Sequence, residues 1–179
     1  MLKITPFLWF DNNAEEAMNF YVSIFKNSKI LHLRRFENAG PGGKGTVVTG
    51  TFELDGQQFM ALQGGPLFKF TEAISMFVNC ETQEEVDYFW EKLTAGGNES
   101  QCGWLKDKFG LSWQIVPSAL GPMLGDKDPA KSKRVMEAML EMQDRHSSVA
   151  ASLRGQVIEQ KRAVTTQPET RWDETLGSS

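Results

Sequence analysis

Two stretches of the chain decide the fold, because the second repeats the pattern of the first. Residues 11–25 read DNNAEEAMNFYVSIF, and residues 82–94 read TQEEVDYFWEKLT. Two glutamates and a phenylalanine recur 69 positions apart: Glu15, Glu16 and Phe20, then Glu84, Glu85 and Phe89. A duplication of this kind indicates two copies of one structural unit.

Each stretch carries the signals of an amphipathic helix. In the first, Asn13 is a suitable N-cap, and acidic residues occupy the first turn, where the helix dipole favours negative charge. In the second, Thr82 is the N-cap and Glu85 its capping-box partner. Apolar residues then follow at helical spacing in both: Ala17, Phe20, Tyr21 and Ile24, then Val86, Phe89, Trp90 and Leu93.

Strands are predicted on both sides of each helix. In the first copy they span residues 4–10, 29–36, 46–54 and 58–63, and Asp55-Gly56 is a strong hairpin signal. In the second copy they span residues 73–78, 103–106 and 111–116. This order specifies an α+β fold of two tandem βαβββ-like modules rather than a doubly wound sheet. Module one covers about residues 3–64, and module two covers about residues 73–117.

The two copies differ in the loop between their second and third strands. In the first copy this loop, residues 37–45, reads ENAGPGGKG, and its glycines formally match GxGxxG. A phosphate-binding loop of that type needs a helix after it, whereas a strand is predicted here. We therefore interpret it as a hairpin loop. Asp55 recurs as Asp107 only 52 positions later, so the second copy lacks most of this loop.

After the second copy the sequence predicts one helix and a tail. Asp128 is a suitable N-cap, and Pro129 fits the first helical position. An apolar stripe follows: Val135, Met136, Met139 and Leu140. The later residues show little hydrophobic periodicity. We expect one domain over residues 1–143, with its C-terminal helix at 129–143, and a polar, weakly ordered tail over 144–179.

The composition argues against several classes of protein. The net charge is −4 at pH 7, from 19 basic and 23 acidic residues, so no nucleic-acid partner is predicted. No apolar run reaches the roughly 20 residues that span a bilayer, and the N-terminus lacks the pattern of a signal peptide. Cys80 and Cys102 are the only cysteines, which is typical of a reducing compartment and predicts a cytoplasmic protein.

The inventory of reactive residues also limits the chemistry. The two histidines, His32 and His146, have no partners at metal-ligand spacing. Cys102 is a weak candidate for a catalytic nucleophile, because a reactive thiol needs a nearby base or cation and only Lys106 is close in sequence. A structural role for both cysteines, as small buried residues, is the simpler interpretation.

The duplicated stretches and the segment GGPLFKFTEAISMFVNC (residues 64–80) closely resemble the PhnB-like branch of the vicinal oxygen chelate superfamily. This superfamily includes glyoxalases, bleomycin-resistance proteins and dioxygenases, and the branch carries the label 3-demethylubiquinone-9 3-methyltransferase-like. The resemblance runs from about Ile4 to Gln143. It implies paired βαβββ modules whose half-open sheets surround a cavity. It also implies a homodimer, because such modules commonly pair between chains.

In metal-dependent members, the resemblance implies His or Glu ligands on the first and last strands of each module. The corresponding positions are residues 4–6, 60–62, 73–75 and 113–115, which hold no histidine or carboxylate. Gln114 is the only weak ligand among them. We therefore expect no metal and no cofactor. Methyl transfer itself is not supported, because no methyl-donor site can be identified in the sequence.

The sequence thus predicts a metal-free protein that binds a small organic molecule. The residues expected to line its pocket are Leu8 (or its neighbour Phe7), Gln63, Ser75, Trp104 and Gln114, with whichever cysteine faces inward. Two alternatives stay open: a metal-independent enzyme on a small organic substrate, with Cys102 or Gln114 in an acid–base or orienting role, and a purely structural dimerising module. Fold-level analogy does not name the ligand.

Overall fold

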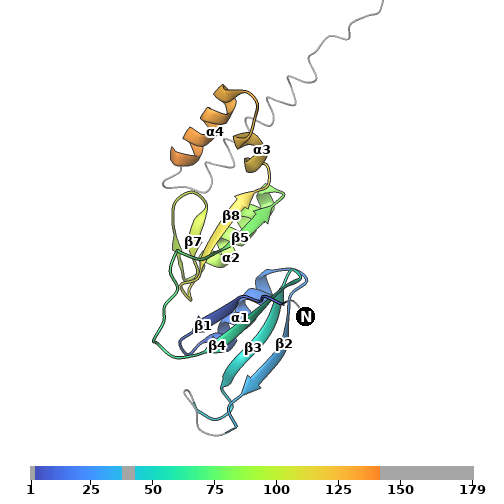
Figure 1. The fold of residues 1–179 in the computed structure, drawn as a ribbon, viewed down its shortest axis with the longest axis vertical. Helices are drawn as coiled ribbons and strands as arrows, with labels where there is room; N and C mark the ends of the chain where they lie inside the picture. The colour runs from blue at the N-terminus through green and yellow to red at the C-terminus, as the bar shows by residue number, and fades with distance from the viewer. Residues whose placement is uncertain (1–2, 38–42, 142–179) are drawn as a thin grey trace, which may run out of the picture.

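The computed structural model describes residues 3–37 and 43–141, which form two four-stranded sheets and four helices (Figure 1). The elements of module one are β1 (Phe7–Phe10), α1 (Ala14–Ile24), β2 (Lys29–Arg35), β3 (Val47–Leu54) and β4 (Gln57–Gln63). Those of module two are β5 (Ser75–Cys80), α2 (Gln83–Thr94), β6 (Asn98–Glu99), β7 (Trp104–Lys106) and β8 (Ser112–Pro117).

The two sheets share one topology, which confirms the predicted α+β fold of tandem modules. The strand orders are β1-β4-β3-β2 and β5-β8-β7-β6. Each sheet pairs its first strand in parallel with its last, and its other neighbours are antiparallel. The sequence did not predict β6, because a two-residue strand is too short to show an alternating pattern.

The β3–β4 turn forms as the Asp-Gly signal predicts. Asp55 and Gly56 have φ angles of 44° and 84°, which is the left-handed conformation that a type I′ hairpin requires. β2 and β3 pair directly on either side of the glycine-rich loop. No helix follows that loop, so the interpretation of its GxGxxG pattern as a hairpin loop is confirmed.

The helix starts were predicted with mixed success. Thr82 caps α2 as expected, with its hydroxyl accepting a hydrogen bond from the Glu85 amide. The Glu85 carboxylate accepts from the amide of Glu81, at 2.8 Å, rather than from that of Thr82. Asn13 occupies the N-cap position of α1, as predicted, but its side chain makes no hydrogen bond to the helix.

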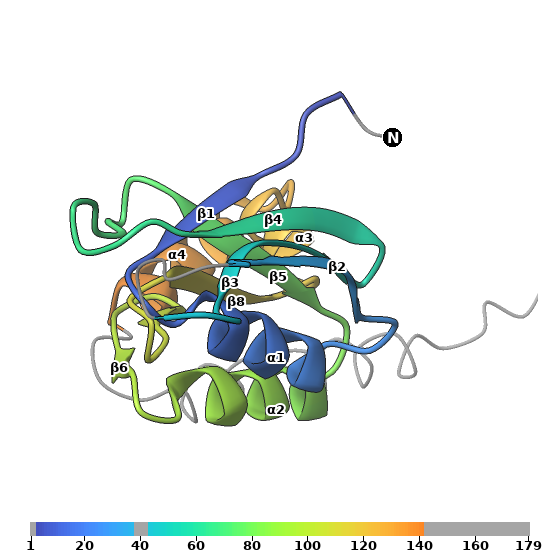
Figure 2. The ribbon, with the colours of Figure 1, turned by 90° about the horizontal axis from the view of Figure 1, so that it is seen from below.

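Aromatic residues join the modules into one hydrophobic core. α1 and α2 lie side by side on the same side of the sheets (Figure 2). Phe25, after α1, stacks on Phe89 of α2 and on Trp113 of β8, with ring centroids 4.9 and 5.4 Å apart. The buried Tyr21 hydroxyl donates to the Asp107 carboxylate at 2.7 Å. Because each of these contacts crosses between modules, the core is continuous.

Two helices follow β8: α3 (Leu120–Leu124) and α4 (Pro129–Glu141). The Asp128 carboxylate accepts from the Ala130 amide at 2.9 Å, so the predicted start of α4 at Pro129 is confirmed. The sequence did not predict α3, because Pro122 interrupts this five-residue segment.

The apolar stripe predicted for α4 is only partly correct. Val135 is buried, but Met136 is 42% exposed. The last two residues of the predicted helix and the expected tail over 144–179 lie outside the described residues. Within the described part of the chain, no helix is both long and apolar enough to cross a membrane.

A candidate ligand pocket between the modules

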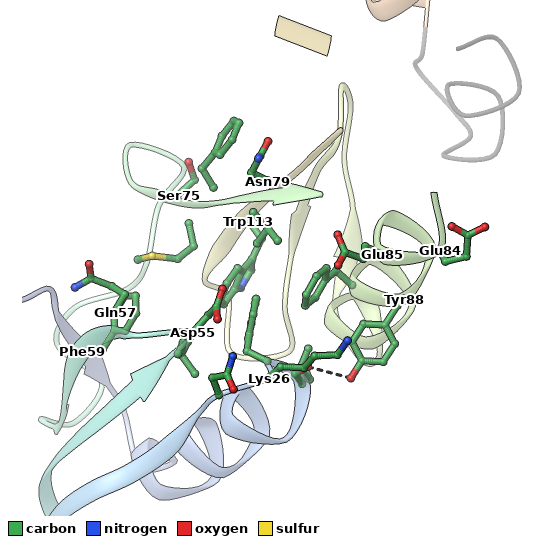
Figure 3. Close-up of a pocket in the computed structure, with 18 residues that line it drawn as sticks. Lys26, Asp55, Gln57, Phe59, Ser75, Asn79, Glu84, Glu85, Tyr88 and Trp113 are labelled. Carbon is green, nitrogen blue, oxygen red and sulfur yellow. Dashed lines mark hydrogen bonds between the residues drawn. The ribbon is translucent and has the colours of Figure 1, made fainter. Parts of the chain in front are cut away.

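A pocket of about 740 Å³ opens between the two modules (Figure 3). It lies where the C-terminal end of α1 and the β3–β4 hairpin face β5 and the start of α2. Small-molecule sites commonly measure roughly 300–1,000 Å³. The pocket therefore has the size of a ligand site.

The free edge of β5 forms one wall of this pocket. All residues from 75 to 79 line it, although alternate side chains of a strand point to opposite faces. They all line it because β5 is the outer strand of its sheet, so its edge borders the cavity. An outer strand presents unpaired backbone N–H and C=O groups. These groups are available to hydrogen-bond a ligand.

Aromatic side chains form the floor of the pocket. Phe25 lies nearly parallel to both Phe89 and Trp113, with interplanar angles of 24° and 22°. Phe59 contributes from β4, where it stacks on the buried Phe52. A flat or apolar molecule that covers this floor would release water from it, which favours binding.

Polar groups lie around the rim. The Tyr88 hydroxyl donates to the Ile24 carbonyl at 3.0 Å, which ties α2 to the end of α1. Asp55 projects from the hairpin and Glu85 from α2, and they stand on opposite sides of the cavity (Figure 3). Lys26 lies beside Tyr88.

Ser75 is the predicted pocket residue that lines this cavity. Its hydroxyl accepts a hydrogen bond from the Gln114 side-chain amide at 2.7 Å. Trp104 is the direct partner of Gln114 in the β7–β8 ladder, so the two side chains lie on the same face of the sheet. The structure therefore brings these three predicted residues together on the neighbouring strands β5, β8 and β7, but Trp104 and Gln114 do not line the pocket.

Leu8 and Gln63, also predicted for the pocket, do not line it. Both side chains are only 7% exposed. The β1–β4 register pairs Leu8 with Ala61 and Phe10 with Gln63, and these positions alternate onto the face that packs against α1. They are core positions of module one, which explains why they are apart from the cavity.

The cysteines lie away from a catalytic geometry. Burial, with the charge of Glu85 as a smaller second cause, raises the pKa of the Cys80 thiol to about 11. Cys80 therefore stays protonated at neutral pH and is a poor nucleophile. Cys102 lies in the turn before β7, with a φ of 55°, and does not line the pocket.

Among the described residues, potential metal ligands do not cluster. Within residues 3–37 and 43–141, no group of three or more His, Cys, Asp or Glu side chains could hold a metal ion. His32 lies exposed on β2, and His146 lies outside the described residues. Ser75 and Gln114 form a neutral hydrogen-bonded pair between β5 and β8.

Most pocket residues were not predicted from the sequence. Asp55 and Glu85 had local explanations, as a turn residue and as a helix-capping residue. The pocket forms only where segments 24–27, 54–59, 75–79 and 84–89 meet across the module boundary. The signal that found Ser75 was the family resemblance, which marks a strand position rather than a cavity.

Known proteins share this architecture. The family model described as 3-demethylubiquinone-9 3-methyltransferase matches residues 2–116. A PhnB protein from Bacillus cereus is 44% identical, with a TM-score of 0.60, and the match covers 65% of this chain and 99% of that protein. A Pseudomonas aeruginosa protein, 20% identical with a TM-score of 0.55 over 65% of this chain and 98% of its own, shares the fold. No curated protein matches.

The paired modules and these likenesses define a vicinal oxygen chelate, or glyoxalase-like, protein. The family model covers more than half of the chain, so the chain belongs to the 3-demethylubiquinone-9 3-methyltransferase family, in the PhnB branch. This confirms the resemblance identified in the sequence. The match ends at residue 116, before α3 and α4.

Proposed function

We propose that this protein binds a small organic molecule in the pocket between its modules, without a metal. The observation that carries the proposal is the pocket itself, about 740 Å³ in volume, with an aromatic floor and a polar rim. Such a combination is typical of small-molecule sites, where apolar surface supplies affinity and a few polar groups fix orientation. The proposal places the protein in the cytoplasm, in keeping with two cysteines that are not joined in a disulfide.

Binding without a metal is favoured by the residues at the ligand positions of the family. Ser75 and Gln114 hydrogen-bond to each other, and neither carries a charge that would hold a cation. We also favour binding over catalysis, because Cys102, the candidate nucleophile, does not line the pocket. Methyl transfer, the activity in the family description, is not proposed.

The proposed binding can be tested by a thermal-shift screen with small metabolites, combined with native mass spectrometry of the purified protein. A ligand at 100 times its dissociation constant adds about 2.7 kcal/mol to the free energy of unfolding. Val78→Trp fills the pocket from β5 and should abolish the shift. Leu31→Trp, on the outer strand β2 and away from the pocket, is the matched control. A shift of equal size in Val78→Trp would contradict the proposal.

We further propose a homodimer in which the open sheet faces of two copies cover each other. Phe7 on β1 and Phe77 on β5 are 54% and 60% exposed, and both belong to outer strands. Exposed aromatic groups beside unpaired strand edges favour association. A stable dimer of this kind buries more than roughly 1,000 Å².

Light scattering tests the dimer directly. Phe7→Asp should convert it to a monomer at tens of micromolar protein. Leu67→Asp serves as the control, because Leu67 is 74% exposed in the segment that connects the modules. A wild-type protein that is monomeric at this concentration would contradict the dimer.

A further inference from the structure

The charged groups of the pocket are mainly acidic. Its ionisable side chains with a formal charge at pH 7 are Asp55, Glu84, Glu85 and Lys26, three negative and one positive. Glu84 points away from the cavity, whereas Asp55 and Glu85 flank it (Figure 3). A ligand in the pocket therefore lies between two carboxylates.

Both flanking carboxylates have capacity for a further hydrogen bond. Glu85 uses Oε2 to accept from the Glu81 amide, which leaves Oε1 for another donor. The backbone amide of Asp55, not its carboxylate, forms a hydrogen bond: it donates to the Ser28 hydroxyl. Within the described residues, the Asp55 carboxylate has no ion-pair or hydrogen-bond partner. A bound cation would supply one.

The aromatic floor lies between these carboxylates. Figure 3 places Trp113 between Asp55 and Glu85, and Phe25 stacks on it. The faces of aromatic rings attract cations. Trp113 is only 2% exposed, so the half-buried Phe25 and Phe89 are the rings of this floor that a ligand can reach. The floor therefore adds to the attraction of the carboxylates and also covers the apolar body of a ligand.

An anion would find the same pocket less favourable. The start of α2 borders it, and the positive end of a helix dipole attracts anions. That first turn already carries Glu84 and Glu85, which oppose an approaching negative charge. Lys26 is the only cationic side chain in the pocket lining. The charge balance therefore discriminates against carboxylates and phosphates.

We propose that the ligand of this pocket is an organic cation with a flat aromatic or apolar body. Its body covers Phe25 and Phe89, and its positive group lies between the Asp55 and Glu85 carboxylates. This inference rests on the proposed function, because it assigns a chemical class to the molecule held in the same pocket.

A series of acridines that share one ring system tests the charge preference by isothermal titration calorimetry at pH 7.5. The probes are 9-aminoacridine, a cation, neutral acridine and the anion acridine-9-carboxylate. We expect the cation to bind about tenfold more tightly than neutral acridine, and the anion to bind most weakly. Added salt should reduce this preference.

Three variants locate the effect. Asp55→Asn and Glu85→Gln should each weaken binding of the cation several-fold and leave binding of neutral acridine unchanged. Glutamine keeps an acceptor for the Glu81 amide, so the second variant preserves the helix start. Glu91→Gln changes the same charge on α2 outside the pocket lining and should leave all affinities unchanged.

The outcomes separate this inference from the function on which it rests. Equal affinities for the three probes, a preference for the anion, or no binding of the cation would overturn the organic-cation class. If Val78→Trp abolishes binding of all three acridines, the probes bind in the pocket. The proposed function then stands even where the three affinities contradict the preference for a cation. If Val78→Trp binds the cation as tightly as wild type, the cation occupies another surface and the inference fails.

Discussion

Asp55 and Asp107 occupy the same place in the two modules, the turn that leads into the last strand of each sheet, but their surroundings differ. Asp55 is exposed at the tip of a tight hairpin. Asp107 is only 2% exposed. The duplicated position therefore has two roles: in module one it makes a turn at the rim of the pocket, and in module two it joins the two modules.

The buried carboxylate of Asp107 accepts four hydrogen bonds. Oδ1 accepts from the amides of Phe109 and Leu111, at 2.8 and 3.1 Å. Oδ2 accepts from the Tyr21 hydroxyl and the Trp113 indole, at 2.7 and 2.8 Å. Only the Tyr21 bond comes from module one. Tertiary contacts, and not the local turn sequence, therefore decide what each duplicated aspartate does.

The largest expected effect follows from replacing each aspartate by asparagine. In Asp107→Asn, an NH₂ group replaces one carboxylate oxygen and faces groups that donated hydrogen bonds to that oxygen. The Trp113 indole N–H can only donate, so it cannot pair with an NH₂ group. We expect a loss of about 2 kcal/mol in the free energy of unfolding. Asp55→Asn should change it by less than about 0.5 kcal/mol, because the site is exposed and asparagine tolerates positive φ. Urea denaturation of both variants measures the difference. Equal losses of unfolding free energy would contradict the different roles of Asp55 and Asp107.

A smaller effect is expected from the two tyrosines that cross the module boundary. Tyr21→Phe removes one of four donors to Asp107 and should cost about 1.5 kcal/mol, because the bond is buried and its acceptor is charged. Tyr88→Phe removes a bond to the Ile24 carbonyl at a site that is 40% exposed. Water can replace this donor, so the cost should stay below about 0.5 kcal/mol. If urea denaturation shows a larger loss of unfolding free energy for Tyr88→Phe than for Tyr21→Phe, the buried hydrogen bond is not the stronger of the two contacts between modules.

The pH dependence of Asp107 gives a still finer test. Burial raises the pKa of this carboxyl above its usual value, and the hydrogen bonds from Trp113 and Tyr21 oppose the shift. A carboxyl whose folded-state pKa is raised stabilises the fold most below its unfolded pKa, and this contribution is lost as the pH rises through the folded value. The stability advantage of wild type over Asp107→Asn should therefore shrink as the pH rises from about 3.5 to 7. An advantage that grows over this range would show that the hydrogen bonds outweigh burial.

Much of the fold was predictable because its signals are local. Asp55-Gly56 specified a tight hairpin and Thr82 a helix start, and each signal acts over a few neighbouring residues. The elements that the sequence missed, β6 and α3, are too short for a periodic pattern. Asn13 shows the limit of a local rule, because it occupies the predicted N-cap position without making the side-chain hydrogen bond of a cap.

The candidate site was less predictable because it is assembled from distant segments. Ser75 was found through the family resemblance, and its bond to Gln114 lies on adjacent strands. Leu8 was assigned to the cavity because strand alternation in the sequence does not say which face packs against the helix. Asp55 of the β3–β4 hairpin and Glu85 of α2 face each other across the pocket because the two modules pack together. The sequence of each module gives no sign of that contact.

The smallest expected effect concerns an exposed ion pair that also crosses the modules. Lys108 Nζ lies 2.6 Å from Glu16 Oε1, and the two side chains are 33% and 61% exposed. Exposed pairs contribute little, so Glu16→Gln should lower the free energy of unfolding by less than about 0.5 kcal/mol, and added salt should remove the difference. Lys108 also lies over the rings of Phe20 and Phe109, at 4.9 and 5.0 Å, and the variant keeps these contacts. Urea denaturation at low and high salt measures the effect. A salt-independent loss as large as that of Tyr21→Phe would mean that surface charge, rather than the buried hydrogen bond, joins the modules.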